Sequence, residues 1–354
     1  MRIAQIAPLT EAVPPLLYGG TERVVAHLCN SLAEMGHEVT LFASAEARTR
    51  ARLVPMRAQA IRLDASPLKS DVAAHLAMLD EVRRRKDDFD ILHFHIDLLH
   101  FPFFEDIAER TLTTLHGRLD LKDLDAAYAR WSAYPLVSIS NRQRAPLPDA
   151  NWTATVSHGI PTDLFKFSPS PEGGYLAFLG RVSPEKGVDR AIALARAAEV
   201  PLKIAAKVDP VDVPYFHRRI EPLLQDPLVE FVGEIGDAHK SAFLGNALAL
   251  LFPVDWPEPF GLVMIEAMAC GTPVVAWDRG AVPEIVEDGV SGFVVRSHEE
   301  ALQAIRQLKS VNRMRVRRVF ERRFSASAMA KRYLEVYARL LRGAACEGTF
   351  KDAV

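Results

Sequence analysis

From residue 257 to residue 273 the chain reads PEPFGLVMIEAMACGTP. The apolar run at 249–253 predicts a buried strand before this segment, and residues 262–270 predict a helix within it. A strand that leads through a short turn into a helix is the repeating unit of a parallel α/β sheet. The segment therefore predicts an α/β fold in which Phe260, Gly261 and Leu262 lie at a helix N-terminus.

Two carboxylates flank this helix start, Glu258 before it and Glu266 within it. A helix N-terminus offers free N–H groups and about half a positive charge, which favour a phosphate. Gly261 has no Cβ, so a ligand can approach the backbone closely. Carboxylates beside a phosphate site suit a ligand that carries both phosphates and sugar hydroxyls. The alternative interpretation makes Glu266 a partly buried helical carboxylate with a local partner.

Short apolar runs alternate with helical patterns along the rest of the chain and form two groups. Predicted strands of the first group are 3–7, 38–43, 90–94, 111–115 and 135–138, with a helix at 21–35. Those of the second are 175–180, 202–206, 229–232, 249–253 and 273–277, with helices at 188–199 and 262–270. The sequence predicts two Rossmann-like domains, 1–164 and 165–324, then a C-terminal helix at 325–343, ended by Gly343, and a flexible tail at 344–354.

Composition narrows the class of protein. The chain has 354 residues, 49% of them hydrophobic and 25% charged, which excludes global disorder and a coiled coil. The net charge of −2 offers no excess of cations for nucleic acid, so we expect no such partner. Three scattered cysteines fit a reducing cytosol, and no apolar run reaches the ~20 residues of a membrane helix. A cytoplasmic location is the expectation.

Two further segments suit an anionic ligand. Arg181 and Lys186 follow a predicted strand in the stretch FLGRVSPEKG, and both side chains bind phosphates. The alternative is a surface loop with solvated cations.

Gly19 and Gly20 follow the first predicted strand, where open α/β sheets bind ligands. The sequence there is not G-x-G-x-x-G, so a dinucleotide-dependent oxidoreductase is disfavoured.

Several histidines follow the predicted strands of the first domain. His116 precedes a glycine at a strand end, where it could bind a sugar hydroxyl, or it could be structural. The cluster of His93, His95, Asp97 and His100 resembles a metal site. We expect His93 and His95 to point to opposite faces of their strand, which argues against a shared metal. His95 or Asp97 could still contact a substrate.

Two basic runs, 83–86 and 313–323, are most simply interpreted as solvated helix faces. The alternative is weak peripheral contact with an anionic membrane, because clustered Lys and Arg attract acidic lipids.

Taken together, these segments resemble the retaining glycosyltransferases of family 4, which have the GT-B fold. The most specific match is the E-x7-E motif from Glu258 to Glu266. Supporting matches are GGTER at 19–23, TLHG at 114–117, GRVSPEKG at 180–187 and VPEIV at 282–286. The resemblance implies an α/β chain of two facing Rossmann-like domains with a cleft between them, and a C-terminal helix that crosses back to the N-terminal domain. One departure is Trp277, whose bulk is expected to narrow the donor side.

The resemblance implies roles for matching residues. Those expected to bind the donor's diphosphate and sugars are Gly19, Gly20, Arg181, Lys186, Glu258, Phe260, Gly261, Leu262 and Glu266. The expected nucleobase platform is 206–208 and 233–235, which contains Val208, Glu234 and Ile235. The acceptor-side residues are Tyr18, His95, Asp97 and His116, and the catalytic ones are Glu258, His116, Arg181 and Lys186. No metal or other cofactor is implied.

The implied activity is transfer of a hexosyl group, with glucose favoured, from a nucleotide sugar to a small-molecule or lipid-linked acceptor. UDP is favoured over GDP or ADP, because the chain resembles a bacterial subgroup of UDP-glucose-dependent glucosyltransferases. The resemblance also implies a same-face reaction without metal. Three alternatives stay open: a nucleotide-sugar epimerase, a sugar phosphorylase, and a nucleotide-sugar sensor without catalysis.

Overall fold

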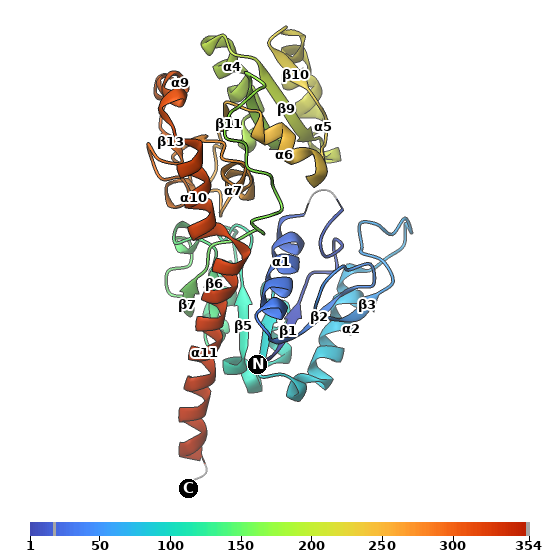
Figure 1. Ribbon diagram of the computed structural model, residues 1–354. Coiled ribbons are helices and arrows are strands. Elements are labelled where there is room, and N and C mark those ends of the chain that lie inside the picture. The colour runs from blue at the N-terminus through green and yellow to red at the C-terminus, as the bar shows by residue number, and fades with distance from the viewer. Residues whose placement is uncertain (17–18, 352–354) are drawn as a thin grey trace. The chain divides into compact units, whose positions relative to one another are not determined.

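The computed structural model describes residues 1–16 and 19–351, with side chains described as far as residue 343. The chain forms two compact units. The first comprises Met1–Gly159 together with Ala326–Val354, and the second comprises Ile160–Ser325. Each unit contains one parallel β-sheet (Figure 1).

The sheet of the first unit has seven parallel strands in the order β3-β2-β1-β4-β5-β6-β7. Their bounds are β1 Arg2–Ile6, β2 Glu38–Ser44, β3 Arg52–Arg57, β4 Ile91–Phe94, β5 Thr111–Thr114, β6 Leu136–Ser138 and β7 Trp152–Thr155. The two edge strands, β3 and β7, were not predicted. Both are only half-buried, and β3 contains Pro55, so neither has a continuous apolar pattern.

The sheet of the second unit has six parallel strands in the order β10-β9-β8-β11-β12-β13. Their bounds are β8 Leu176–Arg181, β9 Leu202–Lys207, β10 Val229–Phe231, β11 Ala249–Phe252, β12 Val274–Trp277 and β13 Gly292–Val295. The edge strand β13 was not predicted. The two parallel, doubly wound sheets confirm the predicted fold class.

Helices connect the strands and cover the sheets. In the first unit they are α1 Gly20–Glu34, α2 Asp71–Arg84, α3 Leu124–Arg130 and α11 Ala326–Lys351. In the second unit they are α4 Val188–Ala198, α5 Val213–Tyr215, α6 Asp237–Gly245, α7 Leu262–Ala269, α8 Val282–Ile285, α9 His298–Gln307 and α10 Arg313–Phe324. The sequence did not predict the bounds of α2 or α9, although Ser70 and Ser297 cap these helices by accepting hydrogen bonds from backbone N–H groups three residues ahead.

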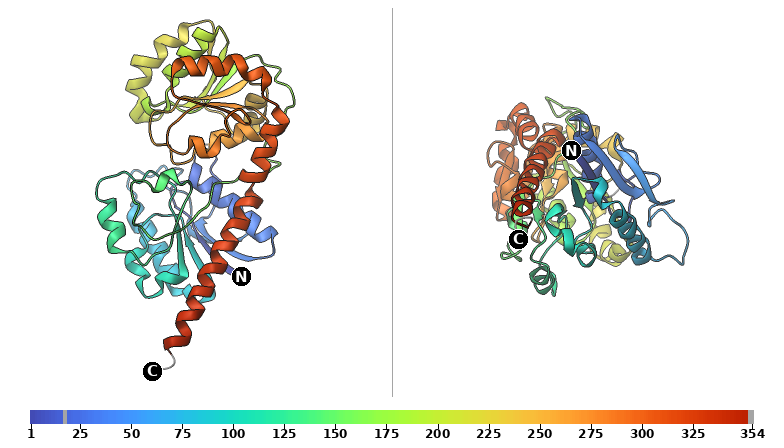
Figure 2. Two further views of the ribbon diagram at one scale, coloured as in Figure 1. Left: turned by 90° about the vertical axis from the view of Figure 1, so that its left-hand side faces the viewer. Right: turned by 90° about the horizontal axis from the view of Figure 1, so that it is seen from below.

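The last helix, α11, packs against α1 and runs along the first unit (Figure 2). It continues through Gly343 to Lys351, so the prediction that Gly343 ends it is wrong. A glycine inside a helix costs about 1 kcal/mol relative to alanine, which weakens a helix without ending it. Among the described residues, no helix is both long enough and apolar enough to span a bilayer.

The two faces of the first sheet differ in chemistry. Leu92 and Phe94 belong to the apolar core that includes α2. Gln5 and His93 point to the other face, where both contact the hydroxyl of Tyr337 on α11. Alternate residues of a strand face opposite sides, so one strand serves an apolar core and a polar interior at once.

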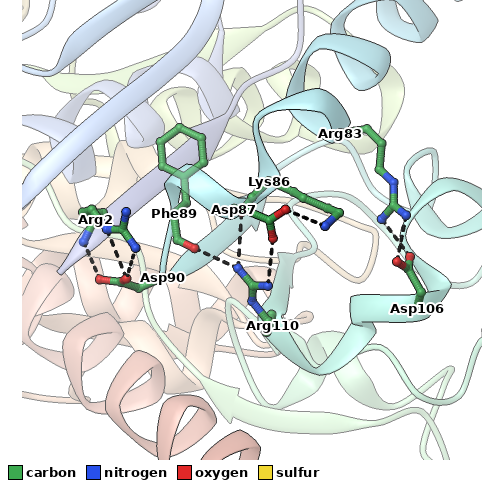
Figure 3. A network of polar contacts seen from close by, with 8 residues as sticks. All are labelled: Arg2, Arg83, Lys86, Asp87, Phe89, Asp90, Asp106 and Arg110. Atoms are coloured by element: carbon green, nitrogen blue, oxygen red, sulfur yellow. Dashed lines mark hydrogen bonds and ion pairs between the residues drawn. The ribbon is translucent and has the colours of Figure 1, made fainter.

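The basic run at 83–86 is paired with carboxylates (Figure 3). Arg83 donates two hydrogen bonds of 2.7 Å to Asp106, and Lys86 lies 2.8 Å from Asp87. Arg110 contacts the same Asp87 and the carbonyl oxygen of Phe89. Neighbouring acids therefore largely balance the charges of the run at 83–86. This pairing weakens the alternative in which the run contacts an anionic membrane.

The basic run at 313–323 is only partly a solvated face, so that prediction is wrong for two of its residues. The buried Arg313 donates to the carbonyl oxygens of Ser168, Ala247 and Gly245. Arg317 donates to three further carbonyl oxygens, those of Thr162, Phe165 and Ala269. Both cations satisfy backbone groups at loops and helix ends, a role that charge counting along a sequence does not reveal.

Candidate active site

The predicted donor-binding residues of the second unit gather at one edge of its sheet. Glu234 and Ile235 follow β10, Val208 follows β9, Arg181 ends β8, and Glu258 follows β11. These strands are neighbours in the order β10-β9-β8-β11. The carboxyl ends of parallel strands share one edge, which is the usual ligand-binding edge of an open α/β sheet.

Glu258 is held by two side chains. Nζ of Lys186 lies 2.5 Å from its Oε2, and Nε1 of Trp256 donates to the same oxygen at 2.9 Å. Glu258 is buried, and Nζ of Lys186 lies 4.9 Å from the centre of the Trp256 ring. The structure thus brings together two of the predicted catalytic residues and adds Trp256, which was not predicted.

The start of α7 is shaped by a glycine and an aromatic contact. Gly261 has a φ of 85°, and a Cβ there would lie 2.8 Å from Cε of Met264 and 3.0 Å from Cζ of Phe252. Phe260 is buried and packs edge-on against Phe324. Leu262 begins the helix, and no side chain of the described residues caps it. Its first N–H groups therefore lie at the same strand edge as Glu258.

Glu266 is buried within α7 and paired with a cation. Nζ of Lys240 on α6 lies 2.9 Å from its Oε1 and 3.2 Å from Oδ1 of Asp237. Lys240 was not predicted. A buried carboxylate with a partly buried Lys partner fits both a ligand-binding and a structural role.

Arg181 lies among carboxylates. Its guanidinium is 2.7 Å from Glu185, 3.5 Å from Asp209 and 3.9 Å from Asp212. Ser183 and then Arg181 help to lower the pKa of Glu185, Lys207 and then Arg181 lower that of Asp209, and burial raises that of Asp212. In this arrangement a phosphate would have to compete with three acids for this cation.

The turn after β12 packs against the backbone of Glu258. The backbone N–H of Ala281 donates to the Glu258 carbonyl at 2.8 Å. Gly280, with a φ of 49°, lies so close that a Cβ would be 2.3 Å from both N and O of Glu258. Trp277, expected to narrow the donor side, is instead part of the hydrophobic core of the second unit. Its position at the end of β12 explains the difference, because strand residues alternate between faces.

A pocket of about 330 Å³ lies in the first unit, and three predicted acceptor-side residues line it: His95, Asp97 and His116. Thr21 at the start of α1 also lines it, and Gly20 is the first residue of that helix, directly after Gly19. Tyr18 lies outside the described residues. Asp97 has a left-handed backbone with a φ of 50°, and desolvation raises the pKa of its carboxyl.

His93 and His95 lie side by side, with ring centres 4.1 Å apart. The prediction that they point to opposite faces is wrong, because residues two apart on a strand share a face. His95 extends this contact to His116, whose ring stacks on that of His158. Within the described part of the chain, no group of three or more His, Cys, Asp or Glu could hold a metal ion.

Burial keeps this histidine cluster neutral. It lowers the pKa of His116 to about 3, and those of His93, His95 and His158 well below the usual value. A buried imidazole loses more by carrying a charge than a solvated one. Each ring therefore has one N–H and one lone pair near neutral pH.

Comparison with known proteins identifies the family. The sequence model described as "Glycosyl transferases group 1" matches residues 160–322, and the one described as "Glycosyltransferase Family 4" matches residues 18–171. The chain belongs to glycosyltransferase family 4. It is a retaining glycosyltransferase that takes its sugar from a nucleotide sugar, and its two parallel sheets are those of the GT-B fold.

Relatives of this family-4 chain align over most of its length. It is 26% identical to a phosphatidyl-myo-inositol mannosyltransferase of Mycolicibacterium smegmatis, covering 83% of this chain and 81% of that protein. The crystal structure of AviGT4, a glycosyltransferase involved in avilamycin A biosynthesis, aligns with a TM-score of 0.73 and 25% identity over 97% of this chain and 98% of AviGT4. HepE of Anabaena, solved with UDP and glucose, aligns with a TM-score of 0.72 and 19% identity over 96% of this chain and 100% of HepE.

Several residues that contact the candidate site residues were not predicted from the sequence: Trp256, Lys240 and Gly280 in the second unit, and Gln5 and Tyr337 in the first. Trp256 precedes Glu258 by two positions, so its place in the motif loop was an available signal. The others come from distant segments, and their contacts arise only when the strands and helices pack.

Proposed function

We propose that the chain transfers a glucosyl group from UDP-glucose to a hydroxyl of a small-molecule or lipid-linked acceptor, with retention, by a same-face reaction that needs no metal. The observation that carries this proposal is the contact of 2.5 Å between Lys186 and Glu258 beside the N-terminus of α7. A cation, a carboxylate and free helix N–H groups at one strand edge suit a sugar diphosphate. UDP is the nucleotide in the HepE complex, and it is the first one to test.

Charge development explains what each group would do. Breaking the anomeric C–O bond builds positive charge on the sugar and negative charge on the diphosphate. Lys186 and the first N–H groups of α7 would stabilise the diphosphate, while Glu258 would accept a hydrogen bond from a donor-sugar hydroxyl. Preorganised groups of this kind often make the largest catalytic contribution.

Arg181 would contribute less to diphosphate binding than Lys186. Three acidic neighbours surround its charge, although Asp209 also pairs with Lys207, whereas among the described residues Lys186 pairs with one carboxylate, Glu258. When a sugar hydroxyl donates to Glu258, Nζ of Lys186 would share its hydrogens between that carboxylate and a phosphate oxygen.

The remaining donor contacts follow from the same strand edge. Glu266 would accept hydrogen bonds from the ribose hydroxyls, and backbone groups around Val208, Glu234 and Ile235 would read the base. In the first unit, Gly19 and Gly20 would approach the phosphates, and neutral His116 would accept a hydrogen bond from a sugar hydroxyl.

The direct test has two steps. Thermal unfolding is followed with UDP, GDP, ADP and NAD at equal concentration, because a ligand at about 100 times its dissociation constant stabilises the native state by about 2.7 kcal/mol. UDP release from UDP-glucose is then measured with and without candidate acceptors, and the anomeric configuration of the product is assigned by NMR. A midpoint raised by UDP and an α-linked product support the proposal. Stabilisation by GDP or ADP in place of UDP redirects the donor, and an inverted product contradicts the mechanism.

A further inference from the structure

Trp256 lies against Glu258 within one short turn. The backbone N–H of Glu258 donates to the carbonyl oxygen of Trp256 at 2.8 Å, and Pro257 stands between the two residues. A hydrogen bond between residues two apart closes a tight turn, and the proline fixes one of its backbone angles. In this turn the indole lies beside the carboxylate, and Nε1 of Trp256 donates to Oε2 of Glu258 at 2.9 Å.

The turn that carries Lys186 is joined to this loop through the backbone. The N–H of Asp255 donates to the carbonyl oxygen of Glu185 at 2.8 Å. Gly187, with a φ of 74°, approaches so closely that a Cβ there would lie 2.3 Å from the carbonyl oxygen of Pro253. The residues on both sides of Lys186 are therefore packed against the loop that follows β11.

Trp256 contacts both members of the Lys186–Glu258 pair, with different parts of its side chain. Its N–H reaches the carboxylate, whereas its ring centre lies 4.9 Å from Nζ of Lys186. The same ammonium lies 6.0 Å from the ring centre of Phe252. A cation near the face of an aromatic ring is attracted by the ring electrons. The indole ring therefore attracts the cation while the indole N–H orients the carboxylate.

The two donors meet at one oxygen of Glu258 but differ in their chemistry. Lys186 and Trp256 both reach Oε2, and neither of these two bonds involves Oε1. The ammonium is charged, carries three hydrogens and binds phosphate as well as carboxylate. The indole N–H is a neutral donor with a single hydrogen. A diphosphate would therefore compete with Glu258 for the ammonium far more strongly than for the indole.

We propose that Trp256 is a positioning residue, which holds the carboxylate of Glu258 by Oε2 while the ammonium of Lys186 turns hydrogens towards the donor's diphosphate. Oε1 then stays oriented for a hydroxyl of the transferred sugar. Because the indole is neutral, the carboxylate keeps its negative charge beside the sugar, where positive charge develops. The sugar and the diphosphate rest on the proposed function, whereas the hold of Trp256 on Glu258 without the cation does not.

The first test follows the indole N–H signals of the four tryptophans by proton–nitrogen NMR of the full chain labelled with ¹⁵N-tryptophan. The Trp256 signal is identified by its loss in Trp256→Phe, and Glu258→Gln should move it because the acceptor loses its charge. In Lys186→Met we expect the Trp256 proton to stay at low field and to exchange slowly with water. Trp131 is the internal control, since its N–H donates to Glu105 at 2.9 Å and its signal should not change.

Two NMR results would overturn the proposal. One is a Trp256 proton that moves to high field and exchanges quickly with water in Lys186→Met, because Glu258 would then depend on the cation for its position. The other is a Trp256 signal that Glu258→Gln leaves in place. If Lys186→Met fails to fold, Lys186→Gln also removes the cation and takes its place.

Kinetics separate the positioning role from a merely structural one. Trp256→Phe keeps an aromatic ring near Lys186 and removes the N–H. It should lower kcat/KM for UDP-glucose about ten- to a hundredfold, the usual effect of losing one hydrogen bond to a charged group. The dissociation constant of UDP, which lacks the sugar, should not change. Trp131→Phe removes an indole–carboxylate bond of the same length from the first unit and should change neither quantity.

Two kinetic results would contradict the positioning role: unaltered turnover of UDP-glucose in Trp256→Phe, or a loss of UDP affinity as large as the loss of turnover. The proposed function can fail separately. If the unaltered protein releases no UDP from UDP-glucose while the Trp256 bond persists in Lys186→Met, only the choice of donor is contradicted. If the unaltered protein releases UDP while the indole bond is lost in Lys186→Met, only the role of Trp256 is contradicted.

Discussion

Nζ of Lys186 lies 2.5 Å from Oε2 of Glu258, although 72 positions separate the two residues. Their side chains are 17% and 9% exposed, so the pair is largely shielded from water. Removing one partner of such a pair leaves an uncompensated buried charge, which typically costs about 3–5 kcal/mol.

Lys186→Met is therefore expected to lower the free energy of unfolding by about 3–5 kcal/mol. It should also lower kcat/KM for the nucleotide sugar about 10²- to 10³-fold, the usual effect of removing one preorganised hydrogen-bond donor. The control is Lys203→Met, which breaks the more exposed pair of Lys203 with Glu230 and its contact with the Tyr175 ring, and should cost about 1 kcal/mol. Urea unfolding and UDP release measure both effects. The catalytic assignment is wrong if Lys186→Met retains full donor turnover.

Glu266→Gln is expected to raise KM for the donor about tenfold with little change in kcat, because the ribose is remote from the reacting bond and a hydrogen bond to a charged group contributes about 1.5–3 kcal/mol. The control is the double variant Lys240→Met with Glu266→Gln, which removes both charges of the buried pair. Stability should recover in the double variant while KM stays high. Recovery of KM as well would make Glu266 purely structural.

Gly280→Ala is expected to lower donor turnover at least about tenfold, because its Cβ would lie 2.3 Å from N and O of Glu258 and displace that loop. Gly289→Ala is the matched control. It has a similar left-handed φ of 71° and nothing within 4 Å of its Cβ, so it reports the backbone strain of about 1–2 kcal/mol alone. Equal kinetics of the two variants would argue that Gly280 does not position Glu258.

Arg313→Met should lower the free energy of unfolding by at least about 3 kcal/mol, because three buried acceptors and one partly buried acceptor lose their donor. Burial lowers the pKa of Arg313 to about 10, so it remains charged at neutral pH. Arg315→Met, on the exposed face of the same helix, should change stability by less than about 0.5 kcal/mol. A small effect of Arg313→Met in denaturant unfolding would contradict its structural role.

Stability should fall as the pH drops from 6.5 towards 5. Five histidines have pKa values below the usual 6.5 in the folded state: the buried His93, His95, His100 and His158, and the partly buried His116. In the unfolded chain they take up protons near pH 6.5, so the unfolded state binds more protons and stability is lost in acid. Each contributes up to about 1.4 kcal/mol per pH unit. His93→Gln should reduce the measured slope by about one proton, and an unchanged slope would contradict the assignment.

Much of the site could be predicted because its residues cluster in short motifs. Glu258, Gly261 and Glu266 lie within one strand–turn–helix segment, and Arg181 and Lys186 lie within another. Local spacing shows that such residues share a turn or a helix start. The partners of these residues could not be predicted in the same way, since Lys240 and Gly280 reach Glu266 and Glu258 from other segments.

The histidines show where local reasoning failed. For His93 and His95, the alternation of side chains along a strand was applied wrongly. For Tyr337, periodicity predicts a buried helix face but not the polar contacts of the hydroxyl. In the sequence, Tyr337 is one apolar position of an amphipathic helix. Only packing of α11 on the first sheet places its hydroxyl against Gln5 and His93.

Chain order, apolar periodicity and compact motifs were sufficient to predict the α/β class, the two sheets and the family. Strands and helices form from residues that are neighbours in the sequence, so local patterns reveal them. Strand order, the half-buried edge strands β3, β7 and β13, and the continuation of α11 beyond Gly343 depended on tertiary structure. So did the partners of Glu258, Glu266 and His116. These features are contacts between residues far apart in the chain, and their free energy is gained only when the segments are packed together.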